Sequence, residues 1–341
     1  MEKKEGLKKL LISFTLAKLA LLLLAVSLSG FSIEAAMTRW DAEHYIEIAL
    51  TGYSSPENFA FSPFFPILIR LVNTVVGIPW LSASLISNAF SYTVIILIYF
   101  LYGERTAYIL AFFPTFLAYT LFPYSEAVSL TFIALTLLLS RNGRNTLSSM
   151  LSYSISILTS YATAITLPSF LFLKRRKLVL IPIVVGIAIL TFFFLETGDP
   201  LYYFKVEGTY WGSDITTPWG QAEWILHGWF TSQSWRLGPL NLPPTYWLAR
   251  NIAFELFFII STAFLALKGR KFELTFSSFI LIQVLCITGV PAISVPRLIL
   301  RALPSFYGAS LFIKEHTKLY CASSFLVSIL VVSQHTLSFF A

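Results

Sequence analysis

Several continuous apolar runs are long enough to cross a lipid bilayer, and they limit the fold of this chain more than any other feature. A membrane-spanning helix needs about 20 mainly apolar residues. In the bilayer core every backbone polar group must be hydrogen-bonded within the protein, so only helices or a closed barrel can span it. The runs are continuous rather than alternating, which indicates helices. The sequence therefore predicts an all-α integral membrane protein.

The composition agrees with this prediction. Hydrophobic residues make up 56% of the 341 residues and charged residues only 12%, whereas soluble domains are about 25% charged. The net charge of +7 comes from short basic clusters between the apolar runs. Such clusters are typical of topology signals and argue against a nucleic-acid partner. Cys286 and Cys321 lie inside apolar runs, so we expect packing residues and no disulfide framework.

We expect one multi-spanning domain over residues 1–341, a bundle of about eleven transmembrane helices. The lysine-rich start and the long apolar run after it indicate a retained first helix rather than a cleaved signal peptide. Residues 146–173 are too short for two full crossings, so we expect a hairpin of short helices that turns near residues 159–163. The clearest spans lie near residues 8–29, 80–102, 105–122, 125–140, 178–195, 246–267, 272–290, 297–313 and 318–340.

Basic loops predict the orientation of the bundle, because Lys and Arg gather on the cytoplasmic side. The loops GER, RNGR, KRRK, KGRK and KEHTK should all be cytoplasmic. This alternation holds if residues 61–77, which contain two prolines and Arg70, lie along the outer surface as an amphipathic juxtamembrane segment. Two large segments, residues 30–79 and 196–245, are then outside.

Charge is concentrated directly after the first apolar run, in the stretch RWDAEHY at residues 39–45. Asp41 would act as a general base if it were held in a cleft, since a carboxylate can take a proton from an attacking hydroxyl. The alternative is a helix start, with Asp41 as N-cap and Glu43 in the first turn. The spacing of Asp41 and Glu43 is only a weak metal pattern.

Two further charged motifs lie near the expected outer membrane edge. FPYSEA places Glu126 at the end of a helix hairpin, where a carboxylate is costly enough to suggest function. Ser125 and Glu126 would also suit a simple helix start. In SVPRLILRALP, Arg297 and Arg301 are spaced i, i+4 and would share one helix face. Guanidinium groups match phosphate oxygens well, although both side chains could also reach lipid headgroups.

Aromatic and acidic residues mix in GDPLYYFKVEGTYWGSDITTPW at residues 198–219, which includes Asp199 and Trp219. Flat aromatic faces beside carboxylates suit sugar rings, but an interfacial aromatic belt has the same composition. No GxGxxG, GxxxxGK or HExxH pattern occurs, which argues against nucleotide-binding and zinc-protease motifs.

In combination and order, RWDAEHYIEIALTGY, FAFSPFFPILIRLV, FPYSEA, GDPLYYF and SVPRLILRALPSF resemble the GPI mannosyltransferase 2 (PIG-V) family of GT-C glycosyltransferases. The resemblance runs over most of residues 10–310. It implies an inverting enzyme that moves a hexose, mannose in that family, from a polyprenyl (dolichyl) phosphate to a glycolipid or other lipid-linked acceptor. It also implies that residues 30–79 form the catalytic loop, with Asp41 as the base, and that residues 196–245 bind substrate. The candidates for binding donor or acceptor are Arg39, Trp40, Glu43, His44, Tyr124, Glu126, Asp199, Trp219, Arg297 and Arg301.

The chemistry of such a donor agrees with these residues. A single phosphate needs less charge neutralisation than a nucleotide diphosphate, and Arg297 and Arg301 could supply it. We therefore expect neither a metal nor another cofactor. The expected partners are the lipid-linked donor, a glycolipid acceptor and membrane lipids, and a partner subunit is left open. The expected location is the plasma membrane of a prokaryote or the endoplasmic reticulum membrane of a eukaryote, with the active site on the outer or luminal side.

Two other classes of protein remain open at this point. A transporter or flippase of lipid-linked sugars would also carry outer charge and aromatics. It should show polar residues through the membrane midplane and repeat symmetry, and the sequence shows neither. A non-catalytic scaffold subunit would bind donor and acceptor without turnover.

Overall fold

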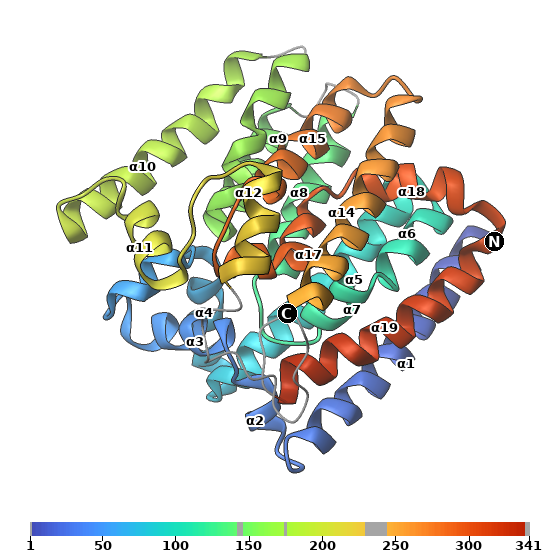
Figure 1. Cartoon of the computed structure of the whole chain (residues 1–341), viewed down its shortest axis with the longest axis horizontal. Helices are drawn as coiled ribbons and strands as arrows, with labels where there is room; N and C mark the ends of the chain where they lie inside the picture. Colours follow the sequence, from blue (N-terminus) through green and yellow to red (C-terminus); the bar gives the residue numbers. More distant parts are fainter. Residues whose placement is uncertain (1, 142–145, 174–175, 229–243, 338–341) are drawn as a thin grey trace.

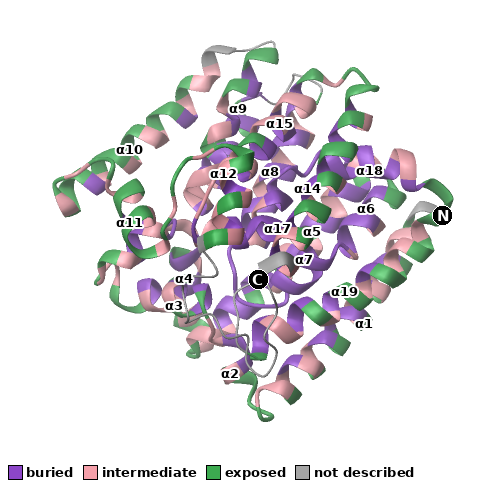
Figure 2. Cartoon of the chain, in the orientation of Figure 1, coloured by how far each residue is buried: buried purple, intermediate pink, exposed green. Residues whose placement is uncertain are grey.

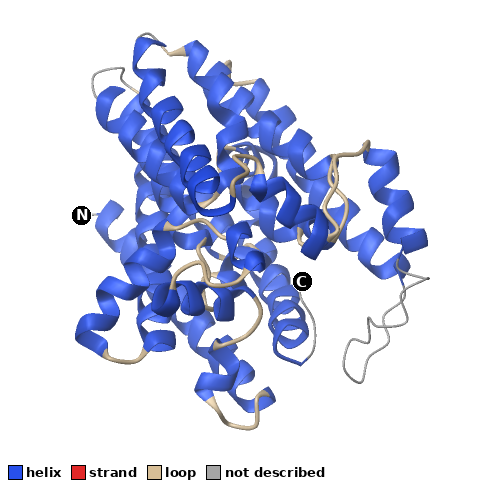
Figure 3. Cartoon of the chain, turned by 90° about the vertical axis from the view of Figure 1, so that its left-hand side faces the viewer, coloured by secondary structure: helices blue, strands red, loops and turns tan. Residues whose placement is uncertain are grey.

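The computed structural model describes residues 2–141, 146–173, 176–228 and 244–337. The structure is 84% helical, and these ranges contain no strand (Figure 3). A single β-bridge joins Ile215 to Ile287. The prediction of an all-α membrane fold is confirmed, and the number of helices is roughly consistent with the expected bundle.

The α-helices follow the chain from one apolar run to the next (Figure 1). They are α1 (Glu2–Leu28), α2 (Ile33–Met37), α3 (Asp41–Thr51), α4 (Phe64–Val76), α5 (Pro79–Tyr102), α6 (Glu104–Ala111), α7 (Pro114–Tyr119), α8 (Glu126–Ser140), α9 (Thr146–Thr159), α10 (Leu180–Thr197), α11 (Tyr202–Trp211), α12 (Pro218–Glu223), α14 (Pro244–Ala266), α15 (Lys271–Leu285), α16 (Val290–Ile293), α17 (Val295–Leu298), α18 (Ser305–Ile313) and α19 (Thr317–Leu337). The chain also has a 3₁₀ helix of 12 residues, η2 (Tyr161–Phe172), and shorter 3₁₀ or π turns: η1 (Pro56–Ala60), η3 (Arg176–Val179), η4 (Trp224–Gly228), η5 (Ile299–Arg301) and η6 (Lys314–His316).

Five helical segments of the described chain are long and apolar enough to cross a membrane, by length and composition. They are Lys4–Leu28, Pro79–Tyr102, Leu180–Thr197, Tyr246–Ala266 and Ser305–Leu337. Shorter apolar helices cover Phe64–Val76, Glu126–Ser140 and Tyr161–Phe172. The chain is therefore a multi-pass membrane protein.

The buried core runs through the middle of the bundle, where α5, α8 and α9 pack together and α14 packs on α18 (Figure 2). α1 and α19 lie side by side along one edge of the bundle (Figure 1). α10 packs on α9 and exposes most of its apolar side chains, including Leu180, Ile187 and Phe194. An apolar exposed face is what a helix in contact with lipid requires.

Prolines break two of the expected spans. The segment 105–122 is divided into α6 and α7, and Pro114 is the first residue of α7. The expected continuous helix over 297–313 is wrong: α17 ends at Leu298, a 3₁₀ turn follows, and α18 begins only after Pro304. Proline has no backbone N–H and clashes with the preceding turn, so it begins a helix more readily than it continues one. Arg297 and Arg301 are therefore not on one regular α-helical face.

The hairpin expected in residues 146–173 is confirmed. α9 ends at Thr159, Ser160 has an extended backbone, and η2 begins at Tyr161. The segment 61–77 contains α4, which buries Phe65 and Ile69 on one side. α4 exposes further apolar side chains on the other side: Ile67, Leu71 and Val75. These two faces suit a helix that lies on a membrane surface, and this position stays a prediction.

Candidate active site

A cavity of about 1070 Å³ lies where α3, η2, α10, α11, α15 and α17 meet. Most of its lining is apolar, as is usual for small-molecule sites. Charged side chains nevertheless gather in it: Asp41, Glu126, Glu207, Asp214, Arg297 and Arg301. In a chain with so few charged residues, this gathering makes the cavity the candidate active site.

Asp41 is held in the cavity by an ion pair with Arg297. The Oδ2 atom of Asp41 accepts a hydrogen bond of 2.6 Å from Nη1 of Arg297, and both side chains are only 9% exposed. Asp41 is the first residue of α3, and Trp40 occupies the N-cap position with a φ of 56°. A positive φ is strained for a tryptophan. The interpretation of Asp41 as the N-cap is therefore wrong.

Arg297 also contacts a second carboxylate. Its Nε atom lies 3.2 Å from Oε1 of Glu126, at the start of α8. The guanidinium group lies over the rings of Tyr124 and Tyr119, 5.3 and 5.6 Å from their centroids. Arg297 thus joins carboxylates from α3 and α8 and stacks on aromatic faces, as a partly desolvated guanidinium prefers.

Ser125 does not cap α8 with its side chain. Its Oγ atom instead shares a hydrogen bond of 2.7 Å with the hydroxyl of Tyr45. The helix start that the sequence also allowed is found in position, with Ser125 at the N-cap and Glu126 in the first turn, but both side chains face long-range partners.

Arg301 lies in the same cavity but has different partners. Its Nη1 atom donates a hydrogen bond of 2.7 Å to Oγ of Ser160, and its Nε atom donates to the carbonyl of Leu298. Within the described residues, no carboxylate is close enough to form an ion pair with Arg301. This arginine therefore retains capacity for an anionic ligand.

The other candidates from residues 30–79 do not line the cavity. His44 stacks on Phe61 with a centroid separation of 4.7 Å, and its Nδ1 atom lies 3.0 Å from Oδ1 of Asn58. Arg39, just after α2, donates to the carbonyl of Ala35 in that helix. Glu43 is exposed, on another side of α3 from Asp41.

Trp40 and Tyr124 both contact the C-terminal helix α19 at His335. The indole Nε1 of Trp40 donates to the backbone carbonyl of His335 at 3.4 Å. The hydroxyl of Tyr124 lies 2.9 Å from Nε2 of the same residue. Neither side chain lines the cavity, so the structure gives them a supporting position, Tyr124 directly beneath Arg297.

Asp199 and Trp219 are not brought into the cavity. Oδ1 of Asp199 accepts from the backbone N–H of Leu201 at 2.9 Å, in the turn before α11. Trp219 is 72% exposed and donates its indole N–H to Glu223 on α12. Other side chains of residues 198–219 line the cavity instead.

Those side chains are on α11 and were missed by the sequence interpretation. Tyr203, Glu207 and Trp211 all line the cavity. Burial raises the pKa of Glu207 to about 7, against a hydrogen bond from Tyr203 that lowers it. The spacing of four residues between these three positions was visible in the sequence and is the signal that could have identified them.

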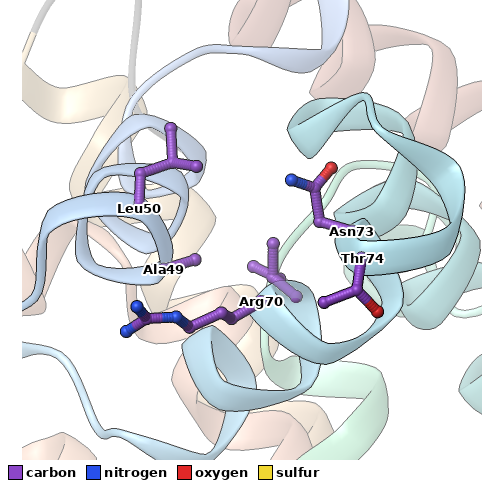
Figure 4. A pocket seen from close by; sticks show the side chains of 6 residues that line it. Ala49, Leu50, Arg70, Asn73 and Thr74 are labelled. Carbon is purple, nitrogen blue, oxygen red and sulfur yellow. The ribbon is translucent and has the colours of Figure 1, made fainter.

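A second hollow, of about 270 Å³, lies between the ends of α3 and α4 (Figure 4). Arg70 is its charged residue, and the other side chains are uncharged: Ala49, Leu50, Ile69, Asn73 and Thr74. It contains no carboxylate beside the arginine, so acid–base chemistry is assigned to the larger cavity. Within the described part of the chain, no three His, Cys, Asp or Glu side chains cluster as metal ligands, and independence from metal stays a prediction.

Comparisons with known proteins give the fold. No protein-family model and no curated protein matches the chain. A solved structure that is similar is that of ArnT from Cupriavidus metallidurans bound to undecaprenyl phosphate, with a TM-score of 0.50 and 12% sequence identity. The match covers 88% of this chain and 60% of ArnT, so the chain spans less than two thirds of ArnT.

This is a GT-C membrane fold. ArnT is itself a GT-C glycosyltransferase. The fold that the resemblance implied is thus found, whereas membership of the GPI mannosyltransferase 2 family is not confirmed.

Proposed function

We propose that this protein is an inverting glycosyltransferase that moves a hexose from a polyprenyl phosphate to a lipid-linked acceptor. The observation that carries the proposal is the buried cluster in which Arg297 joins Asp41 and Glu126, in one cavity with Arg301. The similarity in fold to a protein that binds undecaprenyl phosphate supports a lipid-linked donor. Mannose as the hexose, a glycolipid as the acceptor and a site on the outer or luminal face come from the resemblance and the basic loops.

The apolar part of the cavity suits the lipid tail of such a donor. Gly186, Ile189, Leu190 and Phe193 line it from α10, and Ile165 lines it from η2. α10 is otherwise exposed on its apolar side. A polyprenyl chain could therefore pass from the bilayer along α10 into the cavity and bury apolar surface there, which is favourable by about 25 cal/mol per Å².

The phosphate of the donor would bind at the arginines. Arg301 has no carboxylate partner among the described residues, and its guanidinium group can form paired hydrogen bonds with phosphate oxygens. Arg297 adds positive charge nearby but is already paired with two carboxylates. We assign the leaving phosphate mainly to Arg301, and the positioning of Asp41 and Glu126 to Arg297.

Asp41 is the proposed base. The acceptor hydroxyl gives its proton to the Asp41 carboxylate while its oxygen forms a bond to the anomeric carbon. The bond from that carbon to the phosphate oxygen breaks, and the electron pair leaves with the polyprenyl phosphate, whose charge Arg301 stabilises. A single displacement inverts the anomeric carbon, so a β-linked mannosyl donor would give an α-mannoside.

The proposal is tested with the purified full chain in lipid nanodiscs. It is incubated with polyprenyl-phosphate-mannose and total membrane lipids, and products are identified by mass spectrometry. A hexose-bearing lipid that appears with the wild type and not with Asp41→Asn supports the proposal. Donor that is bound, or moved across a vesicle membrane, without any product would favour a scaffold or transporter instead.

A further inference from the structure

One face of α11 places an aromatic, a carboxyl and a second aromatic side chain in the cavity. Tyr203, Glu207 and Trp211 are four residues apart, so they lie one above the other on the helix. All three line the cavity. We call these three residues the α11 stripe.

Trp211 packs on neighbouring aromatic rings and also lines the cavity. Its ring is edge-on to His44 at 5.8 Å and to Phe61 at 6.1 Å, which fixes its orientation. Its indole Nε1 atom is buried and has no hydrogen-bond partner in the described part of the chain. A buried donor without a partner is costly, and a ligand hydroxyl in the cavity would satisfy it.

Glu207 shares the cavity with the Asp41–Arg297–Glu126 cluster. Its side chain lines the same cavity as those of Asp41, Arg297 and Arg301. The α11 stripe and the cluster therefore face one shared space. A ligand held by one would be within reach of the other.

We propose that the α11 stripe is a sugar-binding subsite that takes a pyranose ring with free hydroxyls. The C–H face of such a ring packs on a flat aromatic side chain, and its hydroxyls pair with the Glu207 carboxyl and the Trp211 indole N–H. A lipid tail would leave the Trp211 indole N–H unpaired. The α11 stripe contains no cation that could pair with a phosphate. This inference rests on the proposed function, because both substrates of that reaction carry sugar.

The first test measures binding and needs no turnover. The full chain in phosphatidylcholine nanodiscs, free of sugar-headed detergent, is mixed with methyl mannopyranoside or methyl glucopyranoside, and saturation transfer to the sugar protons is recorded by NMR. Trp211→Leu and Glu207→Leu should weaken binding about tenfold or more, as expected for loss of a hydrogen bond to a charged group or a stacking face. Glu207→Gln should restore part of the signal.

Matched controls come from the same segment. Tyr210 is an exposed aromatic on α11 and Glu223 an exposed carboxylate on α12, and neither lines the cavity. Tyr210→Leu and Glu223→Leu should bind sugar like the wild type. No saturation transfer from the wild type to the sugar, or equal transfer from Trp211→Leu and Glu207→Leu, would overturn the subsite.

The second test finds which substrate supplies the sugar. The Michaelis constant should rise about tenfold in Trp211→Leu for the substrate whose sugar is bound, donor or acceptor, while kcat changes less. Unchanged constants for both substrates, with product still formed, would refute the subsite and leave the proposed function standing. Sugar binding that is lost in the variants, without product from the wild type, would keep the subsite and refute the transfer reaction.

Discussion

The partners in the Asp41–Arg297–Glu126 cluster should contribute unequally to stability. Arg297→Met removes the cation that joins both carboxylates; the pair with Asp41 is buried, and Glu126 in the second pair is 17% exposed. Breaking a buried pair costs about 3–5 kcal/mol. Because two carboxylates lose their partner together, we expect the upper end of this range, about 5 kcal/mol. Asp41→Asn leaves Arg297 paired with Glu126 and should cost only about 1 kcal/mol, the net value of one hydrogen bond.

Asp41→Asn should lower activity far more than it lowers stability. Asp41→Asn should lower the rate at saturating donor and acceptor by about 10²–10⁴-fold if Asp41 removes the acceptor proton. Thermal unfolding of each purified variant is followed by intrinsic fluorescence beside the rate measurement. Arg70→Met is the matched control, since Arg70 is exposed and should change stability by less than about 0.5 kcal/mol.

Two results would refute this reasoning. If Arg297→Met unfolds no more easily than Arg70→Met, the pairs do not stabilise the fold as their burial implies. If Asp41→Asn keeps a near-normal rate, Asp41 is not the base, and Glu126 becomes the next candidate. Adding Glu126→Gln to Arg297→Met should recover part of the lost stability, because it removes one of the two uncompensated charges.

Three further predictions concern the donor site, pH and orientation. Arg301→Ala should strongly raise the Michaelis constant for donor in steady-state assays. Arg301→Lys should recover only part of the donor affinity, because lysine lacks the paired donors. Full activity in the Ala variant would remove Arg301 from the donor site. The raised pKa of Glu207 means that burial disfavours its ionised form. Thermal stability of the wild type relative to Glu207→Gln should therefore fall as pH rises from about 4.5 to about 7. The same pH profile in both proteins would contradict this. For orientation, single cysteines are placed in a variant without Cys286 and Cys321. An impermeant thiol reagent added outside should label Glu57→Cys and Tyr210→Cys but not Lys268→Cys. The reverse pattern would invert the proposed topology.

The all-α membrane fold was predictable because it depends on local composition. Apolar runs and the prohibition of unpaired backbone groups in lipid leave little freedom. The turn at Ser160 was also predictable, since the segment is too short for two crossings. The break between Arg297 and Arg301 was missed, although Pro304 was visible, because the i, i+4 spacing was given more weight than the proline.

The site was predictable in its charges but not in its pairing. Asp41, Glu126 and Arg297 were recognised as costly charges in an apolar chain, and the structure brings them together. Their contacts could not be derived from the sequence, because Asp41 and Arg297 are 256 residues apart and only helix packing sets the distance. Around Asp199 and Trp219 the composition pointed to the segment that contains α11, whose side chains line the cavity. The helical spacing of α11, rather than composition, decides which of its side chains face the cavity.

The helix breaks explain why a chain with so little charge keeps some of it inside its spans. A broken helix leaves backbone carbonyls without partners, which lipid cannot satisfy. Lys18 of α1 donates to the carbonyl of Thr120 at 2.6 Å, and Asn251 of α14 donates to the carbonyl of Ala292 at 2.6 Å. These polar residues stabilise the ends of α7 and α16, and the second contact lies just before Arg297. Buried basic side chains therefore have two roles here, and the partner shows which one. Lys18 pairs with a carbonyl and stabilises the fold, whereas Arg297 pairs with carboxylates and shapes the site.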